Sequence, residues 1–106
     1  MNNLQSAGFR ILERNFRCRQ GEIDLIAMDY RANKPCLVFV EVKYRKNAKA
    51  GHPEEAVTWR KKKTILRVAS FYLARRRIGT DMPCRFDVIA FEEGLIRHIE
   101  DAFQEE

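Results

Sequence analysis

The chain of 106 residues contains no long apolar run. Its longest uninterrupted apolar stretch, Cys36 to Val40, is far shorter than the ~20 residues that cross a bilayer as a helix. The first residues, MNNLQSAG, lack the basic segment and apolar core of a secretory signal. We therefore expect no membrane-spanning segment and no membrane partner, and we predict a cytoplasmic protein.

Cysteine and histidine are also scarce. The three cysteines, Cys18, Cys36 and Cys84, are odd in number and widely spaced, unlike the even count of a disulfide framework or the paired spacing of a zinc site. We interpret them as reduced thiols of the core. The two histidines stand alone, so His52 is interpreted as a solvated loop residue and His98 as a structural one.

Positive charge is abundant and unevenly distributed. Residues 57–77 hold eight Lys or Arg and no acid, whereas residues 92–106 hold six acids and one Arg. The first 91 residues therefore carry 19 positive and nine negative groups, a net charge of +10. A field of this sign attracts polyanions, so nucleic acid is the predicted partner class. Basic runs also occur as plain solvated helix faces, and charge alone leaves both interpretations open.

Hydrophobic patterning predicts one α/β domain over residues 1–106, in the order α-β-β-β-α-β-β, with 100–106 as an acidic tail. The expected elements are a helix end at Leu4–Gly8, strands at Phe9–Cys18, Glu22–Met28 and Leu37–Arg45, a long helix from Pro53 to about Arg77, and strands at Arg85–Phe91 and Leu95–Ile99. Pro53 suits the first turn of a helix, with Glu54 and Glu55 near its positive end. The predicted apolar stripe of this helix is Val57, Ile65, Val68, Ala69, Tyr72 and Leu73.

Two carboxylates interrupt the second predicted strand, GEIDLIA at residues 21–27. Because side chains alternate along a strand, Glu22 and Asp24 are expected on one face, and Ile23 and Leu25 on the other. Both faces otherwise read as apolar, which is typical of a strand covered on both sides. The acids therefore need an explanation.

The third predicted strand, LVFVEVKYR, carries Glu41 and Lys43 on one face. A short loop joins it to the second strand, so we expect antiparallel neighbours ~4.8 Å apart that place Asp24 beside Glu41. An unpaired carboxylate at such a covered level is costly or keeps its proton. Some cation must compensate the pair.

Two kinds of cation could do so. In the first interpretation, Lys43 or a nearby Arg neutralises one acid and the cluster only fixes strand register. In the second, oxygen ligands hold Mg²⁺ or Mn²⁺, which carboxylates without His or Cys favour over zinc. The candidate ligands are Asp24, Glu41, the backbone carbonyl of Val42 and, as an alternative, Glu22. Lys43 would then orient or help deprotonate the attacking water and stabilise charge on a phosphodiester. The spacing alone does not decide between them.

Several motifs follow one another from Ala7 to about Phe91, namely GEIDLIA, LVFVEVKYR, a Gly-containing loop, PEEAV, a Lys-rich helix and RFDVIAF. With these motifs in this order, the chain resembles the bacterial YraN-like proteins, an uncharacterised family with a Holliday-junction-resolvase-like fold in the PD-(D/E)XK nuclease superfamily. The resemblance implies a restriction-endonuclease-like core, a mixed central β-sheet flanked by helices. It also implies Asp24 as the first acid of the superfamily motif, and Glu41 with Lys43 as its ExK.

The activity implied by the resemblance is metal-dependent endonucleolytic cleavage of DNA or RNA, with DNA favoured and branched DNA as one candidate. Resolvase-like enzymes often act as symmetric pairs, so a homodimer is one predicted assembly. Relatives carry a further amino-terminal helix with a Gly-x-x-Ala/Gly-Glu pattern, which has no counterpart here, and we expect this helix to be truncated. The alternative function is a non-catalytic nucleic-acid-binding module with a nuclease-like fold, and a third is a protein-interaction domain with an acidic docking tail.

Basic side chains of the loop and helix are the predicted nucleic-acid contacts, namely Arg19, Arg45, Lys46, Lys49, Arg60, Lys61 and Lys63. Lys61 matches a position that is usually basic in the family. Such phosphate contacts are salt sensitive and carry no sequence information. Trp59 and Tyr72 are expected to pack, with stacking on an exposed base as the alternative for Trp59. Asp87 is expected to be structural rather than a metal ligand, paired with Arg85 or with a lysine of the helix.

Overall fold

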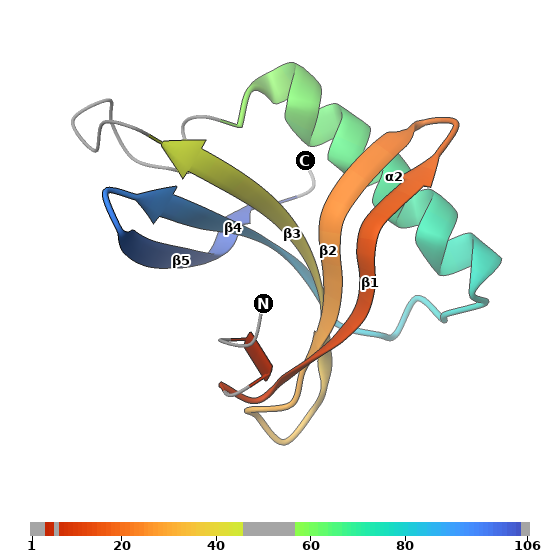
Figure 1. Cartoon of the computed structure of the whole chain (residues 1–106). Coiled ribbons are helices and arrows are strands. Elements are labelled where there is room, and N and C mark those ends of the chain that lie inside the picture. The colour runs from red at the N-terminus through yellow and green to blue at the C-terminus, as the bar shows by residue number, and fades with distance from the viewer. Residues whose placement is uncertain (1–3, 6, 46–56, 105–106) are drawn as a thin grey trace.

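The computed structural model describes residues 4–5, 7–45 and 57–104. Within them, a five-stranded sheet carries one long helix, α2, on one of its faces (Figure 1). The elements are β1 (Phe9–Cys18), β2 (Gly21–Asp29), β3 (Cys36–Arg45), α2 (Trp59–Arg75), β4 (Cys84–Glu92) and β5 (Leu95–Phe103). The predicted class, an α/β fold with a mixed sheet and a restriction-endonuclease-like core, is confirmed. No helix within these ranges is long and apolar enough to cross a membrane.

The strands lie side by side in the order of the sequence, β1-β2-β3-β4-β5. All neighbours are antiparallel except β3 and β4, which run parallel and are connected through α2. Parallel neighbours require such a crossover, because a tight turn cannot return the chain to the same end of the sheet. The strand that carries Glu41 and Lys43 therefore lies at the centre of the sheet, and the helix that follows it starts near that strand's carboxyl end.

The sheet buries apolar residues on both faces. On the helix side, the predicted stripe of α2 contributes Ile65, Val68, Ala69 and Tyr72 to a cluster with Phe39 of β3. A second cluster on the opposite face contains Leu4, Phe9, Leu25, Ala27, Val38, Val40 and Ile89. A strand covered on both sides reads as a continuous apolar run, which explains the sequence of β3 up to its first acid.

The helix begins later than predicted. Thr58 is its N-cap, with extended dihedrals and a side-chain oxygen that accepts a hydrogen bond from the Lys61 N–H at 3.2 Å. Threonine is a favourable N-cap because it satisfies an otherwise free helical N–H. The prediction of an uninterrupted helix from Pro53 is therefore wrong, while Pro53, Glu54 and Glu55 themselves lie outside the described residues.

Near the start of the chain, Gly8 has a φ of 102°, as expected of the residue that closes the turn after Leu4 and Gln5.

The final strand is longer than predicted. β5 extends to Phe103, so residues 100–103 belong to the sheet and the predicted acidic tail from 100 is wrong for them. Phe103 pairs with Phe86 and stacks on its ring, with ring centroids 5.2 Å apart. An irregularity in the β4–β5 pairing, with Asp101 at a φ of 53°, allows the strand to continue past the charged residues.

A fully buried carboxylate, Asp87, lies on the central part of β4. Arg85 donates to both of its oxygens at 2.9 and 3.1 Å, which confirms the predicted pairing. His98 lies 2.7 Å away, and the Asp101 N–H donates at 2.9 Å. Burial favours the protonated form, but the contacts with His98 and Arg85 outweigh it and lower the pKa of Asp87. Arg85 also reaches Asp29 at 2.8 Å, so this network ties β2 to β4 and β5.

Replacing Asp87 tests how much the fold depends on this network. We expect Asp87→Ala to lower the free energy of unfolding by about 3–5 kcal/mol, because it removes the buried acceptor shared by Arg85, His98 and the Asp101 N–H. The measurement is urea denaturation followed by circular dichroism. The control is Asp81→Ala at an exposed position, expected within about 0.5 kcal/mol of the parent. Equal effects of the two changes would contradict the assignment.

Candidate active site

The candidate site forms where β2 and β3 diverge. Their ladder runs from Asp29 opposite Cys36 to Leu25 opposite Val40, and Asp24 is the next residue of β2. Beyond the ladder, the Asp24 side chain takes the place of a backbone carbonyl of β2. Its Oδ2 accepts a hydrogen bond from the Val42 N–H of β3 at 2.7 Å. The gap between the strands is therefore bridged by an acidic side chain, which fixes the Asp24 carboxylate beside β3.

The side chains of β2 stop alternating regularly between the two faces of the sheet at this point. Ile23 packs in the helix-side cluster together with Ile26, whereas Leu25 packs in the cluster on the opposite face. The prediction that Ile23 and Leu25 share a face is therefore wrong. The neighbouring strand β1 is distorted at the same level, where Asn15 has a φ of 52°. The alternation of side chains between the two faces is interrupted at Asp24, and its side chain is directed toward β3.

The structure separates the two acids of β2. Glu22 lies near the β1–β2 turn and forms an ion pair with Arg17 at 2.8 Å, with 41% of its side chain exposed. Burial raises the pKa of the Glu41 carboxyl group, and Asp24, in contrast to Glu22, raises it further through its hydrogen bonding and its negative charge. The acids brought together are therefore Asp24 and Glu41, and Glu22 remains apart with its own cation.

Glu41 lies in a poor environment for a charge. The residue is 7% exposed, and its Oε2 is buried without a hydrogen-bond partner in the described part of the chain. Burial and the adjacent Asp24 raise the pKa of Glu41 to about 7, while the ammonium groups of Lys61 and Lys43 act in the opposite direction. The Lys61 Nζ lies 3.5 Å from Oε2. A carboxylate placed in this way gains strongly from a nearby cation.

Two further groups of β3 complete the candidate site. Lys43 follows Glu41 by two residues, shares its face by alternation and is half-buried. Val42 directs its N–H at Asp24. Since the N–H and C=O of one residue in an extended strand point to the same neighbour, the Val42 carbonyl is directed to that side as well.

These residues fit a hard divalent cation. Mg²⁺ prefers oxygen ligands, uses one or two carboxylates and keeps several waters. Asp24, Glu41 and the Val42 carbonyl supply such a set. The buried Oε2 of Glu41, which has no hydrogen-bond partner among the described residues, is the atom that a cation would satisfy. No group of three acidic, His or Cys side chains suited to a metal occurs among the described residues. The residues present therefore suit Mg²⁺ or Mn²⁺ with water completing the shell, rather than a closed protein cage.

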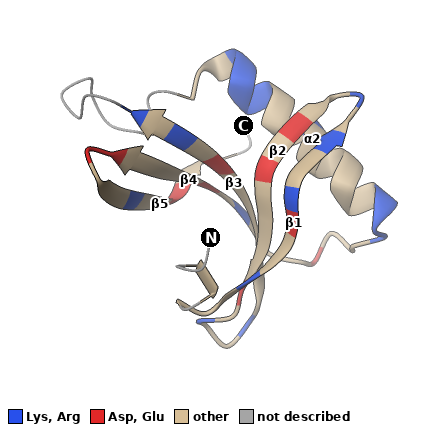
Figure 2. Ribbon diagram, viewed as in Figure 1, with Lys and Arg blue, Asp and Glu red and all other residues tan. Residues whose placement is uncertain are grey.

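Basic residues occupy several segments around the acidic positions. Figure 2 shows Lys and Arg at the start of α2, at the end of β3 and at the β1–β2 turn, around the acidic positions of β2 and β3. Arg19, Arg60 and Lys63 are exposed, as phosphate contacts need to be. Arg45 differs, because its side chain is 10% exposed and lies 3.7 Å from Glu92. Lys46 and Lys49, like His52, lie outside the described residues.

Aromatic residues near the site are exposed to different extents. Trp59 is 67% exposed and carries the Lys63 ammonium 4.1 Å from its ring centre, so the expectation that it packs in the core is wrong. Tyr72 is buried, as predicted. Sequence reasoning missed Tyr44, which is 80% exposed and stacks on Phe91. Together with Arg14, Asn15, Asp24, Leu25 and Val42 it lines a pocket of about 270 Å³. Tyr44 could have been found from the sequence, because it follows Lys43 directly and alternation places it on the opposite face of β3.

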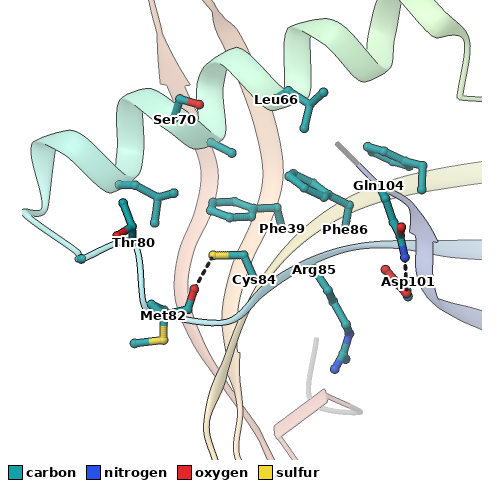
Figure 3. A pocket seen from close by; sticks show the side chains of 14 residues that line it. Phe39, Leu66, Ser70, Thr80, Met82, Cys84, Arg85, Phe86, Asp101 and Gln104 are labelled. Atoms are coloured by element: carbon teal, nitrogen blue, oxygen red, sulfur yellow. Dashed lines mark hydrogen bonds between the residues drawn. The ribbon is translucent and has the colours of Figure 1, made fainter. Parts of the chain in front are cut away.

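A larger cavity, of about 660 Å³, lies away from the acids between α2 and the strands β3 to β5 (Figure 3). Its floor is a row of stacked rings, Phe39, Phe86 and Phe103. None of Asp24, Glu41 and Lys43 lines it. The candidate chemistry is therefore tied to the divergence of β2 and β3 and not to this cavity.

Comparison with known proteins gives a consistent family. Residues 1–91 match the family described as "Uncharacterised protein family UPF0102". A UPF0102 protein of Lachnoclostridium phytofermentans is 47% identical over 102 residues, which are 96% of this chain and 83% of the relative. One of Symbiobacterium thermophilum is 51% identical over 92 residues (86% and 73%), and one of Clostridioides difficile is 44% identical over 105 residues (97% and 88%). The chain therefore belongs to the uncharacterised protein family UPF0102, the YraN-like group that its motifs resemble.

Proposed function

We propose that this protein is a metal-dependent endonuclease that hydrolyses phosphodiester bonds of DNA or RNA. The observation that carries the proposal is the placement of two acids from neighbouring strands. Asp24 is held at β3 by the Val42 N–H at 2.7 Å, and the buried Oε2 of Glu41 has no hydrogen-bond partner among the described residues. A structural ion pair has no need for two adjacent carboxylates. A divalent cation, which takes one or two carboxylates and water as ligands, compensates them.

Each residue of the site has a role in this reaction. Asp24, Glu41 and the Val42 carbonyl would hold Mg²⁺ or Mn²⁺. When bound, the cation polarises a phosphoryl oxygen and acidifies water. Lys43, on the same face as Glu41, orients the attacking water and stabilises negative charge that develops on the phosphate. The Val42 N–H holds Asp24 in place, since its hydrogen bond fixes the carboxylate between the strands.

The first turn of α2 supports nucleic acid as the substrate. It contains Arg60, Lys61, Lys62 and Lys63 and no acid, although the positive end of a helix dipole favours negative charge. Such an uncompensated positive site suits an anion, and exposed Arg60 and Lys63 are placed to contact phosphates. DNA is favoured over RNA, and branched DNA and a homodimer are further expectations, on the resemblance to resolvases alone.

A second function, a nucleic-acid-binding module without catalysis, is favoured by one observation. The described residues offer two carboxylates and no third acid for a metal. If two are too few to hold the ion during turnover, the basic surface still binds nucleic acid. Binding and cleavage must therefore be measured separately.

Substitution of Glu41 separates the two functions. We expect the protein to cleave DNA or RNA with Mg²⁺ or Mn²⁺, and Glu41→Ala to lower the rate at least about 100-fold while binding survives, because the acid holds the ion and the basic residues hold the strand. The measurements are gel-based cleavage of labelled DNA and RNA, and fluorescence anisotropy at rising salt. Glu93→Gln, an exposed acid in the β4–β5 turn, is the matched control and should cleave normally. Salt-sensitive binding without metal-dependent cleavage would select the module.

The pH dependence of stability tests the environment of Glu41. Its pKa is raised from 4.5 to about 7, so the folded protein binds a proton that the unfolded chain releases above pH 4.5. Its contribution to stability is therefore fully present below pH 4.5 and is lost as the pH rises through 7. We expect the metal-free protein to lose up to about 3 kcal/mol between pH 5 and pH 8 through this group.

Urea denaturation at several pH values measures this loss, with Glu41→Gln as the comparison. The amide does not titrate, so the difference in stability between the two proteins isolates Glu41. Added Mn²⁺ should stabilise the parent at pH 8, by about 2.7 kcal/mol at 100 times its dissociation constant, and should leave Glu41→Gln unchanged. Parallel pH profiles for the two proteins would show that Glu41 ionises normally.

A further inference from the structure

The ammonium group of Lys61 occupies the position of a counterion to Glu41. Its Nζ lies 3.5 Å from Oε2, the buried oxygen that has no hydrogen-bond partner in the described part of the chain. The distance is long for a hydrogen bond, so the contact is mainly electrostatic. The two residues come from different elements, β3 and the first turn of α2. Lys61 is thus the nearest cation to the oxygen that a metal ion would also take.

Neighbouring lysines of the same helical turn do not share this role. Lys63 lies over the ring of Trp59 at 4.1 Å, and Lys62 lies over the ring of Phe103 at 5.5 Å. The backbone of Lys61 is fixed by its hydrogen bond to Thr58, but its side chain is 36% exposed and can move at its end. Of the three lysines, Lys61 alone combines contact with Glu41 and access to solvent.

We infer that Lys61 and the divalent cation compete for Glu41, and that cation binding releases Lys61 to a phosphate of the nucleic acid. This inference rests on the proposed function. Lys61 acts as a positioning residue that couples the two binding events. Without metal it neutralises Glu41 and weakens binding of the ion. When the metal ion binds, it takes the Glu41 carboxylate from Lys61 and repels the ammonium group. Lys61 then pairs with a phosphate of the substrate.

The coupling has a physical basis in charge. An ammonium group and a divalent cation repel each other at contact distance, so both cannot stay on the same buried oxygen. Metal binding then increases affinity for nucleic acid by freeing Lys61, and nucleic acid increases affinity for metal by the same factor, because coupling free energies are reciprocal. A site of this kind binds its metal best when a phosphate is present.

The first test measures Mn²⁺ binding without nucleic acid by isothermal titration calorimetry. We expect Lys61→Met to bind Mn²⁺ about fivefold more tightly than the parent, equivalent to ~1 kcal/mol, because the competing charge is gone. Lys63→Met removes the same charge from the same turn and should bind as the parent does, since its ammonium lies over Trp59. Lys61→Arg keeps the charge and should retain parental or weaker affinity.

The second test measures binding of a labelled DNA with and without Ca²⁺, a hard cation that also takes oxygen ligands. In the parent, the ion should raise DNA affinity, and in Lys61→Met this gain should shrink about fivefold. Lys63→Met should bind DNA more weakly in both conditions and keep the gain. Urea denaturation of each variant confirms that it is folded.

The outcomes distinguish the inference from the proposed function. If the parent binds Mn²⁺ no better than Glu41→Gln does, the metal site is absent and the proposed function fails. If binding depends on Glu41 but Lys61→Met and Lys63→Met share one Mn²⁺ affinity, only the role of Lys61 is overturned. Equal tightening in both variants would mean a general effect of net charge, which also overturns it.

Discussion

The candidate site depends on one contact, the meeting of the Asp24 and Glu41 carboxyl groups at the end of the β2–β3 ladder. The strands diverge there, and the Asp24 carboxylate closes the gap by accepting the Val42 N–H at 2.7 Å. This hydrogen bond holds one acid beside the other, although their repulsion and the burial of Glu41 oppose it. Either a proton on Glu41 or a nearby cation relieves this repulsion, and the site contains Lys43 and Lys61 and the oxygen ligands for a metal ion.

The topology explains why these groups converge. β3 is central, and its parallel partner β4 can be reached only through α2, so the helix starts near the end of β3 that carries Glu41. Thr58 sets the first helical turn and thereby the position of Lys61. One strand away, where Asp87 pairs with Val40, the network around Asp87 joins β2, β4 and β5 with a complete set of partners. The two acids differ, because both oxygens of Asp87 accept hydrogen bonds, whereas Oε2 of Glu41 accepts none among the described residues and lies 3.5 Å from the Lys61 ammonium.

Much of this could be predicted from the sequence, because the strands and the stripe of α2 have clear periodicity and short loops make neighbours of β2 and β3. The pairing of Asp24 with Glu41 follows from that reasoning. The interrupted alternation at Asp24 could not be predicted, since it arises from pairing with a distorted β1. Nor could the burial of Arg45 against Glu92 or the extension of β5 to Phe103, because both depend on side-chain contacts and pairing between neighbouring strands. Local patterns therefore predict the elements, and tertiary contacts decide which charges remain available.

The most direct test of the metal site is a crystal structure of the protein soaked in Mn²⁺, with anomalous diffraction data. The proposal predicts an anomalous peak about 2.1 Å from carboxylate oxygens of both Asp24 and Glu41, with the Val42 carbonyl among the ligands and the Lys61 Nζ moved away. A map without a peak between the two acids, and with Lys61 still against Glu41 at saturating Mn²⁺, would contradict it.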